Sequence, residues 1–139
     1  MIALDTNIVL RACVEEVQAD AKTRRQSGVA RALLASGERL FVPLTVTLEL
    51  EWVLRACYGY RAADVVKLLG GLADSEGVVM DHAHAVHSAL ESYSRGMDFA
   101  DALHLALGAT CRELATFDRE FVKKAAQLRL KPPVFVPAA

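Results

Sequence analysis

The stretch from Gly96 to Asp118, GMDFADALHLALGATCRELATFD, decides how we interpret the rest of this chain. It predicts an amphipathic helix, because its inward-facing side chains recur at helical spacing. These side chains are Leu103, Ala106, Leu107 and Thr110, with Ala102 and Leu105 widening the face. Asp98 and Asp101 open the helix, where its dipole favours a carboxylate. Asp118 follows LATF, which predicts a short buried strand, so rigid elements hold all three carboxylates.

Length and composition indicate one globular domain over residues 1–139. The chain has 139 residues, of which 53% are hydrophobic, and this is enough for a substantial core. Its formal net charge of −1 gives no global reason to bind nucleic acid, so such binding needs a local basic patch. No apolar run approaches the roughly 18 residues of a membrane span, and the start lacks a signal-peptide pattern. We therefore expect a cytoplasmic protein without a membrane partner, whose three separated cysteines are buried thiols: Cys13, Cys57 and Cys111.

Strand-like runs alternate with helical patterns along the sequence. Strands are predicted at residues 1–4, 39–42, 77–80 and 114–117, with a proline-bounded edge strand at 132–137. Such alternation is typical of a mainly parallel central sheet covered by helices on both faces. The predicted fold class is therefore α/β, with three layers in the order α/β/α.

Two further carboxylates occupy informative places. Asp5 follows the first strand, at the edge where α/β sheets place their sites, although it could equally be only a helix cap. Glu49 lies on an otherwise apolar strip of the helix predicted at 43–57, where a carboxylate needs a partner, a metal or solvent. Glu51 precedes Arg55 by four residues, which predicts an ion pair on the surface.

Other polar clusters carry less information. Asp81 is predicted to cap the helix that follows it. The histidines nearby do not share one helix face, so we infer no zinc site from His82, His84 and His87. The basic cluster at 22–25 is either a solvated face or a phosphate-contacting surface, and its members are Lys22, Arg24 and Arg25.

The carboxylates together indicate a metal site. Carboxylates that converge from separate segments repel one another and raise one another's pKa unless a cation neutralises them. Oxygen-only ligand sets suit Mg²⁺ or Mn²⁺, and such ions support phosphodiester hydrolysis. The sequence offers neither a recognisable Ser or Cys nucleophile with its base nor a glycine-rich phosphate loop.

Four segments resemble the motifs of PIN domains, and are especially similar to those of VapC-type toxins from bacterial toxin–antitoxin pairs. The segments are LDTNIVL at 4–10, TLELEWVLR at 47–55, DFADALHLALGA at 98–109 and LATFDREF at 114–121. Each segment alone is a weak signal. Together they span the chain in the order and at the spacing of the family, which makes the resemblance specific.

The resemblance implies a three-layer PIN-like fold and a metal-dependent endoribonuclease. The acidic positions of the family fall on Asp5, Glu49, Asp101 and Asp118. These four residues would be catalytic by holding Mg²⁺ or Mn²⁺, which activates water against an RNA phosphodiester. Asp98 matches an additional acidic position of some members, and Thr116 matches a hydroxyl position beside the metal.

The resemblance also implies partners. It predicts an RNA substrate, a homodimer, and a small antitoxin protein whose segment occupies the groove beside the site. Apolar surface expected at 58–72 and in the proline-rich end supports the dimer. RNA contacts are expected from local cations, with Arg11, Arg24, Arg25, Arg95, Arg119 and Lys123 as candidates.

Other functions are weighed against this one. A PIN-type RNA-processing nuclease without an antitoxin would differ in its gene neighbourhood, and a non-catalytic binding module would be indifferent to metal. A phosphoacceptor signalling domain would need a second acid beside Asp5 and a lysine after the last strand. The sequence has Leu4 before Asp5 and ends in VPAA, which opposes that function.

Overall fold

The computed structural model describes residues 1–138 and shows a mixed α/β protein with parallel strands, so the predicted fold class is confirmed. The chain divides into two compact units, Met1–Ala83 and His84–Ala139, each with its own parallel strands. The helices of the described residues are α1 (Thr6–Cys13), α2 (Ala21–Leu34), α3 (Leu44–Tyr58), α4 (Ala62–Ala73), α5 (Ala83–Ser94), α6 (Phe99–Leu107) and α7 (Arg119–Gln127). Their strands are β1 (Ile2–Ala3), β2 (Leu40–Val42), β3 (Val78–Met80), β4 (Leu114–Ala115) and β5 (Val134–Phe135).

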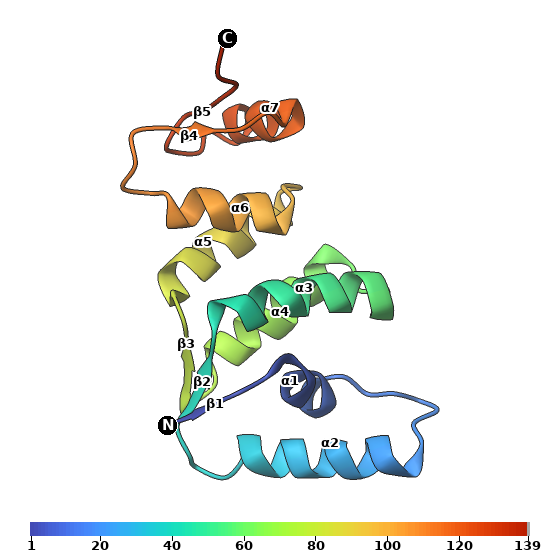
Figure 1. The fold of residues 1–139 in the computed structure, drawn as a ribbon. Coiled ribbons are helices and arrows are strands. Elements are labelled where there is room, and N and C mark those ends of the chain that lie inside the picture. The colour runs from blue at the N-terminus through green and yellow to red at the C-terminus, as the bar shows by residue number, and fades with distance from the viewer. Residues whose placement is uncertain (139) are drawn as a thin grey trace. The chain divides into compact units, whose positions relative to one another are not determined.

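The first unit is built on a three-stranded parallel sheet in the order β1-β2-β3. Ile2 pairs with Leu40, and Leu40 pairs in turn with Val78, so β2 is the central strand. Leu40 and Val42 of β2 are almost wholly buried, as expected for the middle strand of a parallel sheet. Helices α3 and α4 pack together beside this sheet (Figure 1, green) and complete its core with Leu50, Leu54, Val65 and Leu69.

Aspartates begin the first two helices. The Asp5 carboxylate accepts a hydrogen bond from the Thr6 N–H at 2.8 Å, and the Asp20 carboxylate accepts one from the Thr23 N–H at 2.7 Å. Helices α1 and α2 then pack against each other (Figure 1, blue). Asp5 is thus a helix cap, one of the two roles that the sequence allows, and the cap occupies only its Oδ1 atom.

The buried face of α3 differs from the predicted stripe. Its buried residues are Val46, Thr47, Leu50, Glu51 and Leu54, whereas the sequence pattern favours Leu50, Val53, Leu54 and Cys57. The prediction of a surface position for Glu51 is therefore wrong. Glu51 is only 4% exposed and accepts a hydrogen bond from Arg55 Nε at 2.8 Å, because a carboxylate on the inner face needs a charged partner. Glu49 lies on the exposed side of the same helix.

Asp81 caps a different helix from the predicted one. Its Oδ2 atom accepts a hydrogen bond from the Leu44 N–H at 3.1 Å, at the start of α3. Its Oδ1 atom lies 2.9 Å from His82 Nδ1. The reason lies in the sequence before α3, where Pro43 is the N-cap and has no side-chain hydrogen bond to offer. The carboxylate at the end of β3 supplies that bond instead.

Two surface expectations are also wrong. The three cysteines are exposed instead of buried, since they lie at the end of α1, in the last turn of α3 and in the loop after α6. No large hydrophobic side chain at residues 58–72 is exposed within the described part of the chain, because α4 turns Val65, Leu69 and Leu72 inward. That segment therefore gives no support to a dimer.

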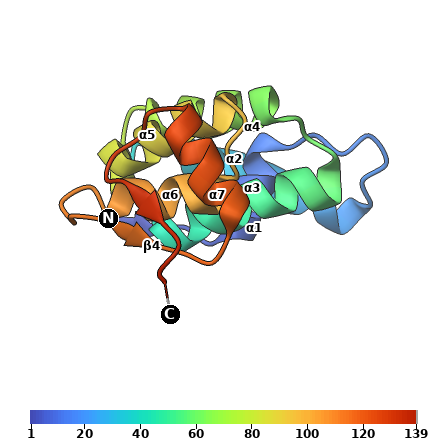
Figure 2. The same cartoon turned by 90° about the horizontal axis from the view of Figure 1, so that it is seen from above.

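The second unit contains most of α5, together with α6, α7 and a two-stranded parallel pair, in which Leu114 pairs with Val134. Helix α7 packs against this pair (Figures 1 and 2, orange to red). Helix α6 buries its face around Phe99, whose ring meets that of Tyr93 edge-on at 5.4 Å. The predicted inner positions Leu107 and Thr110 are exposed, because α6 ends at Leu107.

None of the described helices combines the length and the apolar character needed to cross a bilayer.

Candidate functional site

Three of the predicted site carboxylates line one cavity in the second unit. Asp98 and Asp101 come from the start of α6, and Asp118 comes from the start of α7. They line a cavity of about 440 Å³. The remaining lining residues are Gly96, Met97, Glu120, Phe121 and Lys124. The structure thus gathers acidic side chains that lie up to twenty residues apart in the sequence, and we call this space the acidic cavity.

Helix capping orients two of these carboxylates. Asp98 is the N-cap of α6, and its Oδ2 atom accepts a hydrogen bond from the Asp101 N–H at 3.0 Å. Asp118 is the N-cap of α7, and its Oδ1 atom accepts hydrogen bonds from two N–H groups of the first turn at 3.0 and 3.2 Å. The Asp118 N–H in turn donates to Thr116 Oγ1 at 3.0 Å. In each capping carboxylate the second oxygen accepts no hydrogen bond from residues 1–138, so it is available to a ligand.

Asp101 is the carboxylate whose proton affinity the cavity changes. Partial burial raises the pKa of Asp101, and the charges of Asp98 and Asp118 raise it further, while His104 acts in the opposite direction. The protein without a cation therefore disfavours the negative charge on Asp101. A cation in the cavity would remove this electrostatic penalty.

Two residues of the acidic cavity were missed by sequence reasoning. Glu120 and Lys124 both line it from α7. Their spacing of four residues on a helix that begins at Asp118 is the signal that could have identified them. Lys124 Nζ lies 3.4 Å from the position that a Cβ atom on Gly96 would take, so one protein cation already faces the carboxylates.

The other two predicted site residues, Asp5 and Glu49, belong to the first unit. Both are exposed, and Glu49 makes no hydrogen bond or ion pair with residues 1–138. Beside Asp5, the hydroxyl of Thr6 is buried without a hydrogen-bond partner among the described residues. A buried hydroxyl of this kind is a place for an ordered water.

Comparison with known families decides how these carboxylates are interpreted. The family model of the PIN domain matches residues 2–127 of the chain. The chain belongs to the PIN domain family. No curated protein matches its sequence. PIN domains are nucleases that generally depend on metal ions, and the matched range contains every predicted site residue of this chain.

The donor atoms of this PIN domain fit a hard divalent cation. All of the predicted ligands are carboxylates, which suit Mg²⁺ or Mn²⁺. The capping aspartates each retain one oxygen, and burial and neighbouring charges raise the pKa of Asp101. No group of three His, Cys, Asp and Glu side chains within residues 1–138 is already arranged to hold an ion.

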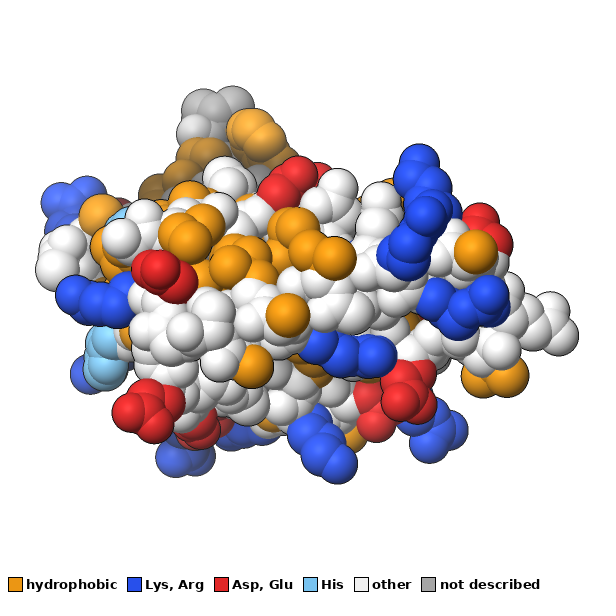
Figure 3. Space-filling model, turned by 90° about the horizontal axis from the view of Figure 1, so that it is seen from below, with side chains coloured by type: hydrophobic (Ala, Val, Ile, Leu, Met, Phe, Trp, Pro, Cys, Tyr) orange, Lys and Arg blue, Asp and Glu red, His pale blue; other side chains and the backbone are white. Residues whose placement is uncertain are grey.

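The predicted RNA-contacting cations of this PIN domain differ in their surroundings. Arg11 and Arg25 line a pocket between α1 and α2, whereas Arg24 donates to the Ala19 carbonyl oxygen at 2.6 Å. The remaining candidates, Arg95, Arg119 and Lys123, are exposed. On the face drawn in Figure 3, the Lys and Arg side chains (blue) stand in small groups among uncharged and acidic (red) ones. Any RNA contact on that face must therefore come from local groups of cations.

Proposed function

We propose that this PIN domain is a metal-dependent endoribonuclease and the toxin of a toxin–antitoxin pair. The observation that carries the proposal is the acidic cavity, in which three carboxylates at motif positions of a nuclease family meet in one space. The toxin role rests on the similarity of all four motifs to VapC-type toxins. We propose further that residues 1–139 act as a single nuclease domain in the cytoplasm.

The metal ligands in this proposal are the acids that the family resemblance selects, Asp5, Glu49, Asp101 and Asp118, with Asp98 as the additional position of some members. A bound Mg²⁺ or Mn²⁺ would activate a water and offset negative charge on the scissile phosphate. The chain's own contribution is to fix the carboxylates in advance. Backbone N–H groups hold one oxygen of Asp98 and one of Asp118, so that ordering these side chains costs little when the ion binds.

Cleavage of a panel of RNAs by the purified protein tests the enzymatic part. We expect cleavage of phosphodiester bonds with Mg²⁺ or Mn²⁺ and none with EDTA. Cleavage that continues in EDTA would contradict the metal dependence. An absence of cleavage with either ion, on hairpins and single strands alike, would contradict the ribonuclease function.

Expression tests the toxin part. Production of the protein in a bacterial host should arrest growth, and a small protein encoded by a neighbouring gene should relieve the arrest by binding it. The alternative of an RNA-processing PIN nuclease predicts cleavage without arrest and without such a neighbour. The proposed homodimer is checked by light scattering at micromolar concentration, where a monomer would contradict it.

A further inference from the structure

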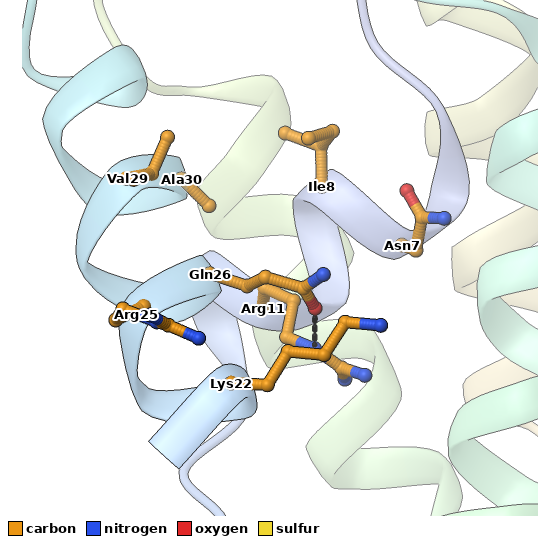
Figure 4. A pocket seen from close by; sticks show the side chains of 8 residues that line it. All are labelled: Asn7, Ile8, Arg11, Lys22, Arg25, Gln26, Val29 and Ala30. Atoms are coloured by element: carbon orange, nitrogen blue, oxygen red, sulfur yellow. Dashed lines mark hydrogen bonds between the residues drawn. The ribbon is translucent and has the colours of Figure 1, made fainter.

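A second pocket, of opposite charge to the acidic cavity, lies within the first unit. It occupies about 340 Å³ between α1 and α2, and we call it the basic pocket. Its cations are Arg11, Lys22 and Arg25, and its other lining residues are Asn7, Ile8, Gln26, Val29 and Ala30. Figure 4 shows that the two helices contribute these side chains jointly, with Arg11 from α1 and Lys22 from α2 beside each other.

Arg11 is held in place by neighbouring polar groups. Its Nε atom donates to Gln26 Oε1 at 3.1 Å (Figure 4), and its Nη1 atom lies 3.7 Å from Glu16 Oε1. The Tyr58 hydroxyl donates to the same Glu16 oxygen at 2.8 Å. This chain of contacts orients the guanidinium but offsets part of its charge.

Lys22 and Arg25 keep their full positive charge. Neither forms an ion pair with a carboxylate of the described residues. Cations brought together in one concave space without counter-charges raise the local positive potential, which attracts an anion. Arg24, between them in the sequence, does not line the pocket and is bonded to the backbone at Ala19. Of the three cations in the cluster at residues 22–25, two thus line the pocket.

The pocket also has an apolar end. Figure 4 shows Ile8, Val29 and Ala30 grouped apart from Arg11 and Lys22. Val29 is 69% exposed, although a side chain of its kind is usually inside. Cations at one end and apolar side chains at the other, of which Val29 is exposed and Ile8 partly so, match the two chemistries of a nucleotide, an anionic phosphate and an apolar base face.

The position of the basic pocket in the chain relates it to the nuclease site. Asn7 lines the pocket and lies two residues after Asp5, within the same motif LDTNIVL. Arg11 follows Asp5 by six residues on α1, which corresponds to about 9 Å along a helix axis. The basic pocket therefore lies within about two turns of the helix start that Asp5 caps.

We propose that the basic pocket binds a backbone phosphate of the RNA substrate outside the bond that is cut, with the adjoining nucleotide lying against Ile8 and Val29. This inference rests on the proposed ribonuclease function for the identity of the strand. Lys22 and Arg25 act as positioning residues that bind the substrate, and neither takes part in the chemical step. A pocket of this kind gives affinity for single-stranded RNA without a broad basic surface, as a chain of net charge −1 requires.

RNA binding by a double variant and a matched control tests the proposal. Lys22→Gln/Arg25→Gln and the control Arg31→Gln, at an exposed cation of α2 that does not line the basic pocket, are each made in the Asp101→Asn background, so that the RNA is not cut. The affinity for a labelled single-stranded RNA is measured by anisotropy across a salt series in Mg²⁺. We expect the double variant to bind roughly tenfold or more weakly, with a salt slope lower by about 0.7 per lost phosphate contact. The control should keep the affinity and slope of its parent.

The same substitutions in the active protein separate binding from chemistry. The double variant should raise KM and leave kcat unchanged, because the pocket acts on the substrate away from the cleaved bond. Equal affinity, slope and KM in the double variant and in Arg31→Gln would overturn the inference, and this result is expected if the pocket binds an acidic protein segment instead. If the wild-type protein cleaves no RNA at all, the proposed ribonuclease function fails. The anisotropy series still decides whether the basic pocket binds RNA. Thermal unfolding of all variants confirms that they are folded.

Discussion

The acidic cavity and the basic pocket are of similar size but are built in opposite ways. In the acidic cavity, Asp98 and Asp118 are first of all helix caps, and the same backbone bonds that start α6 and α7 orient their carboxylates. In the basic pocket, the side chains of Lys22 and Arg25 have no hydrogen-bond or ion-pair partner within residues 1–138, and they meet Arg11 only through the packing of α1 on α2. Asp98 and Asp118 therefore contribute to folding through their caps, whereas Lys22 and Arg25 do not stabilise the fold through such contacts. The net charge of −1 gives no indication of either the carboxylates of the acidic cavity or the cations of the basic pocket, because it is a sum that does not show where charges lie.

The largest expected effect on RNA cleavage is that of Asp101→Asn, a substitution in the acidic cavity that leaves the basic pocket unchanged. Removing a metal ligand should lower RNA cleavage by more than the roughly 10- to 100-fold that loss of an outer-shell partner costs. The fold should persist, since Asp101 is not a cap. Asp74→Asn, at an exposed carboxylate that lines neither site, is the matched control and should keep wild-type kcat/KM. Near wild-type cleavage by Asp101→Asn would remove the acidic cavity from the mechanism.

The effect of a metal ion on Tm should distinguish the acidic cavity from the basic pocket. Mg²⁺ binds only the folded carboxylate set, so it should raise Tm, by an amount corresponding to about 2.7 kcal/mol at a hundredfold excess over Kd. Asp118→Asn should reduce this rise, while Lys22→Gln/Arg25→Gln should leave it unchanged. A rise that is equal in all three proteins, or absent from wild type, would show that the acidic cavity is not the site of the ion. Differential scanning calorimetry of each protein, with Mg²⁺ and with EDTA, measures the rise in Tm.

Asp81→Ala affects neither site and tests capping alone. The substitution leaves the Leu44 N–H at the start of α3 without its acceptor. We expect a loss of about 1 kcal/mol in the free energy of unfolding, which is a few degrees in Tm, with RNA cleavage retained. Chemical denaturation measures the loss. A fall in kcat without a fall in stability would show that Asp81 belongs to the functional site.

The smallest expected effect concerns pH in the metal-free protein. Folding raises the pKa of Asp101 above its ordinary value of 3.8, so the folded state binds this proton more tightly than the unfolded state. The Asp101 contribution therefore destabilises wild type as pH rises above 3.8 through the folded pKa, and it vanishes below 3.8. Asp101→Asn in EDTA should consequently have a slightly higher Tm than wild type at pH 7, and the difference should shrink as the pH is lowered. A difference independent of pH would indicate a cause other than titration.

Local rules explain what sequence reasoning could predict. The alternation of strands and helices, the cap at Asp5 and the start of α6 at Asp98 depend on side chains and backbone within a few residues. Such interactions are encoded at short range. For the same reason the predicted fold class agreed with the structure, and the motif acids Asp98, Asp101 and Asp118 could be selected before their cavity was known.

Only tertiary structure decided which side of each element faces inward and which distant groups meet. Periodicity predicted a surface position for Glu51 and an apolar strip around Glu49. Packing chose the opposite, because it buries the face of α3 that contains Glu51 and leaves Glu49 exposed. Asp81, at the end of β3, caps α3 through its bond to Leu44, which lies thirty-seven residues earlier in the chain. No local sequence pattern predicts a bond over that separation. In the same way, the sequence determined that Lys22, Arg24 and Arg25 form a basic cluster. The contact between α1 and α2 determined that Lys22 and Arg25 share a pocket with Arg11 while Arg24 does not, because a pocket between two helices exists only once both are packed.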